Sequence, residues 1–236
     1  MIDVNNKFIK ESKKISVSLS GGADSAILFY HACDVLPDKT FIPWSGFDTR
    51  RPDSIFYAMD VYSFVKKSYP NVNILPHHTF RYTTETSEFQ TSEKWDWKKD
   101  PKSVAHHNEE VKLFNKHKFD LTLNGMTCNP PEEAIKKFKM NVDTGHGVIE
   151  PRRSVRDRPH WLHSSKNFRG VYCPFVQEDK SYVKKMYEKY GVLNTLFPLT
   201  ASCIGFPYET DNGQKPCMNC VWCKERLWAF GEEHLQ

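Results

Sequence analysis

Short runs of β-prone apolar residues alternate along the chain with stretches in which apolar residues recur at helical spacing. The strand-like runs cover residues 15–19, 40–44, 71–75, 119–123 and 170–175. The helix-like stretches cover residues 27–36, 52–68, 102–118, 132–140 and 178–190. Strands and helices in alternation are typical of a parallel sheet that carries helices on its faces. The pattern therefore predicts a doubly wound α/β fold with a mainly parallel, five-stranded sheet.

Two long stretches lack this alternation, and we expect them to form loops. Residues 76–101 are polar and aromatic, which favours an insertion or a covering loop. Residues 141–167 are basic, and four arginines lie between positions 152 and 158. They could clamp a triphosphate or a nucleic acid backbone, or they could form a solvated surface. The histidine pairs at 77–78 and 106–107 are expected at the surface.

The turn between the first strand and the first helix reads S-G-G-A-D-S at residues 20–25. Two adjacent glycines let backbone N–H groups point into one hollow, and the helix adds its free N–H groups and the positive end of its dipole. Such a junction binds anions, phosphate above all. Ser20 and Ser25 add hydroxyl donors, and Asp24 could cap the helix or help hold a metal. An ordinary strand-to-helix turn would use the same glycines, so the anion site is a hypothesis.

The fourth predicted strand ends in a second polar turn. It reads Asn124-Gly125, and a double proline follows at 130–131. Open α/β sheets bind ligands at the carboxyl ends of their strands, so this turn should lie near the first one. Cys128 in the same loop could be a nucleophile, although a partly buried thiol is the commoner explanation.

Four cysteines near the C-terminus have the spacing of a metal site. Cys203 is followed by Cys217, Cys220 and Cys223, in the form C-x13-C-x-x-C-x-x-C. Thiolates at C-x-x-C spacing reach one ion from a tight turn, and four of them complete the tetrahedral shell of a structural Zn²⁺. An iron–sulfur cluster is also held by four thiolates, and it stays open as the competing interpretation. Seven cysteines without a secretory apolar segment favour thiols or metal over disulfides.

The hexapeptide at 20–25 resembles the pyrophosphate-binding SGGxDS motif of the N-type ATP pyrophosphatases. These enzymes split ATP between its α and β phosphates and leave AMP on the substrate. The resemblance implies an adenine nucleotide alpha-hydrolase-like fold and a requirement for ATP and Mg²⁺. It also implies a catalytic pair, in which Asp24 helps hold Mg²⁺ and Lys180 contacts phosphate. The nucleotide-binding residues that it implies are Ser18, Ser20, Gly21, Gly22, Ala23, Asp24, Ser25, Trp44, Asn124 and Gly125.

The C-terminal pattern is similar to that of the 7-cyano-7-deazaguanine synthases, a family within this group. The similarity joins Cys203 and the C-x-x-C-x-x-C triplet to the residues K-E-R at 224–226 and A-F at 229–230. It implies an ATP-dependent ligase of queuosine-type deazapurine biosynthesis. Such an enzyme activates 7-carboxy-7-deazaguanine as an acyl adenylate, forms the amide with ammonia, and dehydrates the amide to the nitrile with a second ATP.

The chain departs from that family in three places. Met218 stands where the family usually has glycine, and the loop between Cys203 and Cys217 is longer than is typical. The family's acidic, tyrosine-containing segment after the fourth strand, which helps hold the deazaguanine, is not matched at residues 126–133. The acceptor could therefore be a related carboxylate, or the same one held differently.

Composition adds bounds to this prediction. The net charge of +4 suits an anionic ligand and does not require nucleic acid. No apolar run approaches the roughly 20 residues that a membrane span needs, and we expect a cytoplasmic protein. We expect an ATP pyrophosphatase domain at 1–200 and a zinc-binding lobe at 201–236. The chain could act alone or as a homodimer.

Two other functional classes stay open. One is a different AMP-forming ATP pyrophosphatase, such as a tRNA thiolase or a sulfate-adenylate reductase-like enzyme. A thiolase would need a reactive cysteine or an iron–sulfur cluster near ATP. The other is a non-enzymatic nucleotide-binding zinc protein, which would bind nucleotide without releasing AMP or pyrophosphate.

Overall fold

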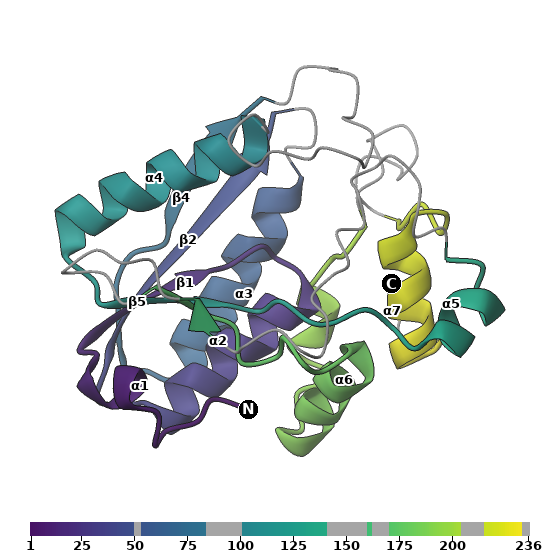
Figure 1. Cartoon of the computed structure of the whole chain (residues 1–236), viewed down its shortest axis with the longest axis horizontal. Helices are drawn as coiled ribbons and strands as arrows, with labels where there is room; N and C mark the ends of the chain where they lie inside the picture. Colours follow the sequence, from purple (N-terminus) through teal and green to yellow (C-terminus); the bar gives the residue numbers. More distant parts are fainter. Residues whose placement is uncertain (50–52, 84–100, 141–159, 162–169, 204–214, 233–236) are drawn as a thin grey trace.

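A computed structural model describes residues 1–49, 53–83, 101–140, 160–161, 170–203 and 215–232 (Figure 1). Its centre is one sheet with strand order β3-β2-β1-β5-β7-β6, and β4 also pairs with β2. The strands are β1 (Lys14–Ser18), β2 (Thr40–Asp48), β3 (Asn73–Ile74), β4 (His78–Tyr82), β5 (Leu121–Asn124), β6 (His160–Trp161) and β7 (Val171–Tyr172). Every pair is parallel except β6 with β7. The predicted parallel α/β fold is confirmed.

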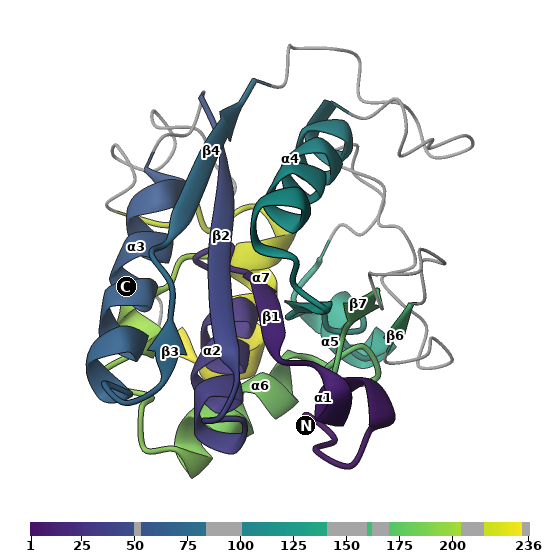
Figure 2. The ribbon, with the colours of Figure 1, turned by 90° about the vertical axis from the view of Figure 1, so that its left-hand side faces the viewer.

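Seven strands, two more than predicted, make up the described sheet. The additional strands lie inside the stretches that were predicted to be loops, β4 within 76–101 and β6 within 141–167. β3 and β4 follow each other along the same edge of β2, as Figure 2 shows, because Phe41 pairs with Ile74 and Trp44 pairs with His78. The rest of both stretches, including the four arginines, lies outside the described residues.

Seven α-helices and a short 3₁₀ segment, η2 (Phe197–Leu199), accompany the sheet in the described part of the chain. The helices are α1 (Lys7–Glu11), α2 (Ala23–Val35), α3 (Ser54–Ser68), α4 (Pro101–His117), α5 (Glu132–Lys137), α6 (Lys180–Lys189) and α7 (Val221–Phe230). The sequence pattern did not predict α1 or α7. Of the described helices, none has the length and apolar character needed to cross a membrane.

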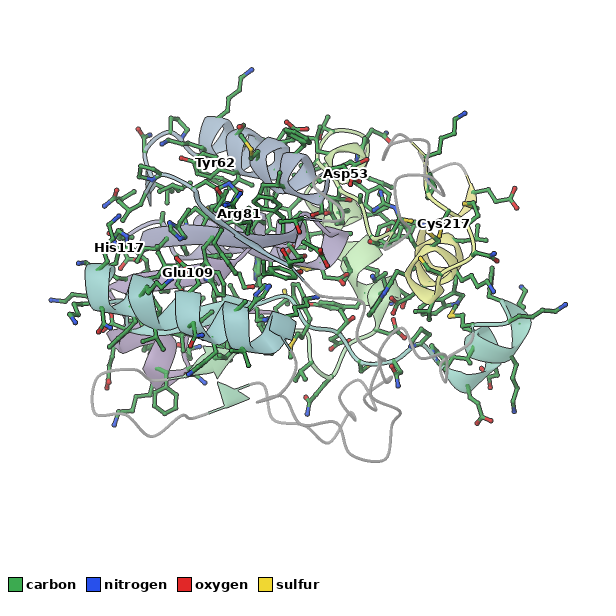
Figure 3. The ribbon with its side chains drawn as sticks, turned by 90° about the horizontal axis from the view of Figure 1, so that it is seen from above. Asp53, Tyr62, Arg81, Glu109, His117 and Cys217 are labelled. Atoms are coloured by element: carbon green, nitrogen blue, oxygen red, sulfur yellow. The ribbon has the colours of Figure 1, made fainter. Side chains whose placement is uncertain are left out.

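Alternation along the strands assigns the helices to opposite faces of the sheet. In β1, Ile15 and Val17 face the larger apolar cluster with α2, whereas Ser16 between them bonds Thr122 of β5 at 2.7 Å. Thr122 in turn donates to Glu110 of α4 at 2.6 Å, so the polar positions point toward α4. Successive side chains of a strand point to opposite faces, which makes the arrangement doubly wound. Figure 3 shows α3 and α4 on opposite sides of the strands.

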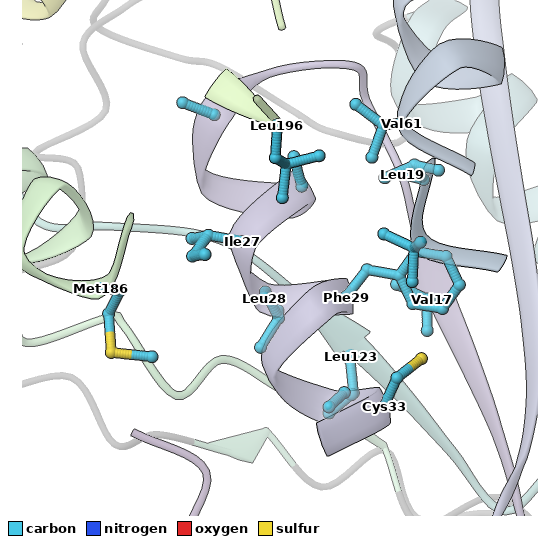
Figure 4. Close-up of a cluster of buried hydrophobic side chains, with 14 of the residues drawn as sticks. Val17, Leu19, Ile27, Leu28, Phe29, Cys33, Val61, Leu123, Met186 and Leu196 are labelled. Carbon is cyan, nitrogen blue, oxygen red and sulfur yellow. The ribbon is translucent and has the colours of Figure 1, made fainter. Parts of the chain in front are cut away.

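Helix α2 is the centre of the larger core. Ile27, Leu28 and Phe29 are fully buried, so this helix is apolar on several sides at once. Figure 4 shows side chains of the sheet, α3, α6 and the segment before η2 closing around it, among them Val17, Val61, Leu123, Met186 and Leu196. Rigid packing of α2 fixes its first turn, which is where the candidate site lies.

Candidate active site

The glycine turn connects the carboxyl end of β1 to the first turn of α2. Gly21 has φ +78°, and a Cβ there would lie 2.9 Å from the backbone nitrogen of Ala58 in α3. Gly21 is therefore required both by its conformation and by the close approach of α3. Gly22 is the N-cap of α2, and no side chain caps this helix. The expectation that Asp24 could cap α2 is wrong, since Asp24 lies within the first turn.

The two serines of the turn bond each other. Their Oγ atoms lie 3.0 Å apart, and the Ser25 hydroxyl accepts from the Ser20 N–H at 3.1 Å. Ser25 also donates to the Gly22 carbonyl at 3.1 Å, and the Gly22 N–H donates to Ser20 Oγ at 3.2 Å. These bonds fold residues 20–25 into a closed turn. Ser25 is buried and Ser20 is exposed, so Ser20 is the hydroxyl at the open side.

Three predicted nucleotide-binding residues lie in one row across the sheet. Ser18 of β1 pairs with Trp44 of β2 on one side and with Asn124 of β5 on the other. Trp44 is only 4% exposed and packs in the smaller apolar cluster, 6.0 Å from Phe80 between ring centroids. Its Nε1 is buried without a hydrogen-bond partner among the described residues. The structure thus gives Trp44 a packing role, while its contact with nucleotide stays a prediction.

Gly125 joins the end of β5 to the first turn of α2. A Cβ at Gly125 would lie 2.7 Å from the Ser25 nitrogen and 2.8 Å from the Asp24 carbonyl carbon. Both contacts are with backbone that the core holds in place. Any side chain at position 125 would therefore push the glycine turn away from the sheet. On the far side of the same turn, the buried Tyr187 hydroxyl donates to the Ala23 carbonyl at 2.9 Å.

Asp24 and Lys180, the predicted catalytic pair, are in contact. Lys180 is the first residue of α6, and its Nζ lies 3.2 Å from Asp24 Oδ2. Both helices follow parallel strands, so their N-termini meet at the carboxyl edge of the sheet. The Lys180 side chain is 3% exposed and that of Asp24 is 23% exposed. The pair is therefore held at the glycine turn, with Asp24 as its more exposed member.

A second carboxylate, from Glu225 of α7, completes the group. Glu225 Oε2 lies 3.2 Å from Lys180 Nζ, and the Glu225 side chain is fully buried. One lysine between two carboxylates has a formal charge of −1. The sequence analysis included Glu225 in the C-terminal pattern but did not predict a role for it in the site. The available signal was a glutamate two residues after the last cysteine, inside a stretch of otherwise apolar and basic residues.

Arg226, the next residue of α7, fixes the segment that precedes Cys203. Its guanidinium donates to Thr200 Oγ1 at 2.9 Å and to the Phe197 carbonyl at 3.3 Å, and it lies 3.8 Å from the centre of the Phe197 ring. Burial lowers the pKa of Arg226 to about 10, so the group keeps its charge at neutral pH. The next residue in that segment, Ala201, donates its N–H to the Gly21 carbonyl at 3.0 Å.

The four predicted metal ligands meet at the start of α7, where Figure 3 labels Cys217. Their Sγ atoms all lie within 4.8 Å of one another, with 4.0 Å between Cys217 and Cys223 and 3.4 Å between Cys220 and Cys223. Backbone N–H groups of residues 217, 220 and 223 point at the sulfurs of Cys203, Cys217 and Cys220. Hydrogen bonds with Cys203 and Cys220 raise the pKa of Cys223, and a bound cation would offset this crowding of thiols. The cluster fits a metal ion.

The remaining cysteines lie elsewhere in the fold. Cys33, Cys128 and Cys173 are buried thiols that form no disulfide in the described part of the chain. Burial raises the pKa of Cys128 to about 11, so this thiol is neutral at physiological pH. A neutral thiol is a poor nucleophile, which argues against catalysis by Cys128.

Two of the histidines differ from the expected surface positions. His77 stacks on Tyr62 and lies 2.7 Å from Ser45 Oγ, and burial lowers its pKa to about 4. His106 packs among aromatic rings, with Phe80 at 5.1 Å and Trp44 at 5.8 Å between centroids. Both histidines belong to the packing between β2, β4 and their neighbours. The reason is β4 itself, because the sequence pattern did not predict a strand there.

The similarity of this chain to known proteins is one of structure at low sequence identity. No protein-family model matches the sequence, and no curated protein matches it. The solved structures that match include the U34-tRNA thiolase NcsA of Methanococcus maripaludis, with its four-iron, four-sulfur cluster, at 16% identity and a TM-score of 0.44. That match covers 75% of this chain and 56% of the thiolase. The chain thus corresponds to little more than half of the thiolase's length.

A second solved structure is an NMN synthetase from Francisella tularensis. It matches at 10% identity with a TM-score of 0.46, and the match covers 96% of this chain and 88% of that one. At such low similarity, neither enzyme's chemistry carries over to this chain. Function has to be inferred from the chain's own residues.

Proposed function

We propose that this protein is an AMP-forming ATP-dependent ligase that activates a carboxylate. The observation that carries the proposal is the glycine turn at residues 20–25. It lies at the carboxyl edge of a parallel sheet, at the uncapped N-terminus of α2, with Lys180 and Asp24 beside it. This is the position at which an α/β sheet binds an anionic ligand.

The charge of the site supports nucleotide binding together with Mg²⁺. Asp24, Lys180 and Glu225 sum to −1, which would repel a bare triphosphate. Asp24 has the most exposed side chain of these three residues, and it would hold the Mg²⁺ that accompanies ATP. The Mg²⁺ would in turn neutralise the charge of the phosphates. The N–H groups of α2 would then bind pyrophosphate as it develops charge.

We propose a reaction in two stages, each of which uses one ATP. A substrate carboxylate oxygen attacks the α phosphorus of ATP, the bond from that phosphorus to the bridging oxygen breaks, and pyrophosphate leaves. Ammonia attacks the resulting acyl adenylate and displaces AMP to give an amide. The amide oxygen attacks the α phosphorus of a second ATP and pyrophosphate leaves, and loss of AMP and two protons from the adenylated amide gives the nitrile. The protein contributes chiefly by positioning the reactants and by electrostatic stabilisation.

We take 7-carboxy-7-deazaguanine as the specific substrate, on the strength of the two sequence motifs. The reactivity of the cysteines favours this ligase over a thiolase, because Cys128 is held as a neutral thiol near the site. The four-cysteine centre would hold structural zinc. Zinc–sulfur bonds of about 2.3 Å in a tetrahedron separate the sulfurs by about 3.8 Å, close to the spacing found here, whereas a four-iron cluster would hold the thiolates farther apart.

One assay tests the proposal. The protein is incubated with Mg²⁺, ATP, ammonium and 7-carboxy-7-deazaguanine labelled with ¹⁸O in its carboxylate, and products are identified by mass spectrometry. We expect two AMP and two pyrophosphate per nitrile, with one ¹⁸O in each AMP, because the carboxylate oxygens leave on phosphorus. AMP formation with a different carboxylate alone would refute the deazaguanine assignment, and formation of ADP would refute the reaction class.

Two variants on the same helix make a matched control. Lys180→Met should abolish most AMP formation, because it removes the buried cation at the glycine turn. Lys185→Met changes an exposed lysine of α6 in the same way, and it should leave the rate unchanged. Equal rates in both variants would remove Lys180 from the mechanism.

A further inference from the structure

Two routes connect the four-cysteine centre to the glycine turn. The first runs through α7, whose N-cap is Cys220 and whose first turn contains Cys223. Two residues further on, Glu225 contacts Lys180, and Lys180 contacts Asp24 in α2. The second route runs through Ala201, two residues before Cys203, which donates its N–H to the Gly21 carbonyl. Both ends of the metal site thus lead to residues 20–25.

Glu225 is an unusual residue for the interior of a helix. Its side chain is fully buried and its contact is with a lysine that is almost as deeply buried. A buried ion pair seldom stabilises a fold more than apolar packing would, because both charges lose their hydration. A positional role explains the glutamate better. It holds the Lys180 ammonium from the interior of the fold, so that the ammonium contacts two carboxylate oxygens at the glycine turn, one from Glu225 and one from Asp24.

Helix α7 is held at its last turn by the apolar core, where the buried Phe230 stacks on Phe197, and a bound metal would anchor its first turn. It has 10 residues, and an isolated helix of that length is marginal in water. A metal bound by Cys220 and Cys223 would fix its first turn. Glu225 follows Cys223 by two residues, which is a rise of about 3 Å along the helix. A metal that fixes the two thiolates therefore also restrains Glu225, which lies less than one helical turn away.

We propose that Glu225 is a positioning residue for Lys180, and that the metal centre holds Glu225 in place through the first turn of α7. The catalytic consequence rests on the proposed function, whereas the positioning itself does not. Loss of either the carboxylate or the metal would release the Lys180 side chain from the glycine turn. The four-cysteine centre then serves the nucleotide site as well as the fold.

The first test measures the position of Lys180 without using activity. Wild-type protein and Glu225→Gln are treated with an amine-acylating reagent at pH 8, and the rate at each lysine is read by peptide mass spectrometry. We expect Lys180 to react at least tenfold faster in Glu225→Gln, while the exposed Lys185 on the same helix reacts equally in both. The control Glu188→Gln makes the same substitution at an exposed residue of α6 and should leave Lys180 protected.

The same labelling decides the part played by the metal. Wild-type protein is depleted of metal by a chelator, and circular dichroism verifies that it stays folded. Lys180 should then react as fast as in Glu225→Gln, and added Zn²⁺ should restore its protection. If Glu225→Gln does not fold, Glu225→Asp replaces it, and we expect partial release because the shorter carboxylate reaches less far. Protection of Lys180 that is unchanged in the variant and in the depleted protein would overturn the proposal.

A double-mutant cycle measures the catalytic consequence. Glu225→Gln should lower kcat for AMP formation by about a hundredfold, because displacing the Lys180 ammonium by about 1 Å should slow the reaction by about that factor. In the Lys180→Met background the same substitution should have no further effect on kcat. Additive losses would overturn a role through Lys180. If wild-type protein forms no AMP with any carboxylate, the proposed function fails, and the labelling still decides whether Glu225 positions Lys180.

Discussion

Replacing Gly125 by alanine tests whether the end of β5 holds the glycine turn in place. The added Cβ would lie 2.7 Å from the Ser25 nitrogen, 2.8 Å from the Asp24 carbonyl carbon and 2.9 Å from the Asp24 oxygen. An ordinary contact begins near 3.4 Å, so β5 and the first turn of α2 must separate by about 0.7 Å. Neither side can yield by rotating a side chain, because all three contacts are with backbone.

The expected cost has two parts. Overpacking of this kind destabilises a protein by about 1–3 kcal/mol, which for a chain of this size lowers Tm by roughly 2–12 °C. The glycine turn moves with α2, and a displacement approaching 1 Å should weaken Mg²⁺-ATP binding or lower kcat by at least about tenfold. Urea unfolding measures the first effect, and calorimetric titration with Mg²⁺-ATP together with AMP formation measures the second.

Gly191→Ala is the matched control. Gly191 has φ +65° and nothing lies within 4 Å of the place that a Cβ would take, so alanine there costs only backbone strain of about 1–2 kcal/mol. This variant should lose stability while binding nucleotide as the wild-type protein does. If Gly125→Ala has the same stability in urea unfolding and the same affinity for Mg²⁺-ATP as the wild-type protein, the close approach of β5 to α2 does not shape the site.

Three further predictions concern buried polar groups. Tyr187→Phe removes the hydroxyl that donates to the Ala23 carbonyl, and we expect a loss of about 1 kcal/mol in urea unfolding; unchanged stability would show that this bond contributes nothing. Burial lowers the pKa of His31 and His77 to about 4, so the unfolded chain binds more protons between pH 4 and 6.5. Stability should therefore fall as pH drops through this window, by up to about 1.4 kcal/mol per pH unit for each histidine, and imidazole NMR signals of the folded protein that titrated near pH 6.5 would contradict this. Cys128 should resist iodoacetamide at pH 7.5 in the folded protein and react once the protein is unfolded. The variant Cys128→Ser identifies the modified peptide. Rapid modification of Cys128 in the folded protein would disprove the raised pKa.

Local sequence signals predicted the parts of the fold that depend on neighbouring residues. The turn at 20–25 is a contiguous sequence pattern, and three of the four cysteines lie close together at 217–223. Only Cys203 is distant from the others. The contact of Asp24 with Lys180 was also accessible, because both residues follow parallel strands and so lie at one edge of the sheet. The predicted division into residues 1–200 and 201–236 stays a prediction, as do the nucleotide-binding roles of the individual residues.

Other features depended on contacts that no local pattern encodes. β4 was missed because its burial is only partial and its residues, which mix a histidine and an arginine with aromatics, do not form an apolar run. It becomes a strand because β3 pairs only with Thr40 and Phe41 of β2 and leaves the same edge of β2 open at Trp44–Asp48. His106 likewise became a packing residue only when that strand placed Phe80 and Tyr82 beside it.

The sequence by itself determined a parallel α/β sheet, a glycine turn between the first strand and the first helix, and a group of four cysteines, because strand and helix periodicity, backbone freedom and ligand spacing are all local properties. Only the tertiary structure decided that Glu225 lies against Lys180, that Gly125 packs on α2, and that the cysteine centre is linked to the glycine turn. These contacts join residues that are distant in the chain, and their positions are set by how the helices pack on the sheet. The glycine turn of the proposed anion site is therefore encoded locally, whereas the group of charges that would make it a catalytic site is assembled by the fold.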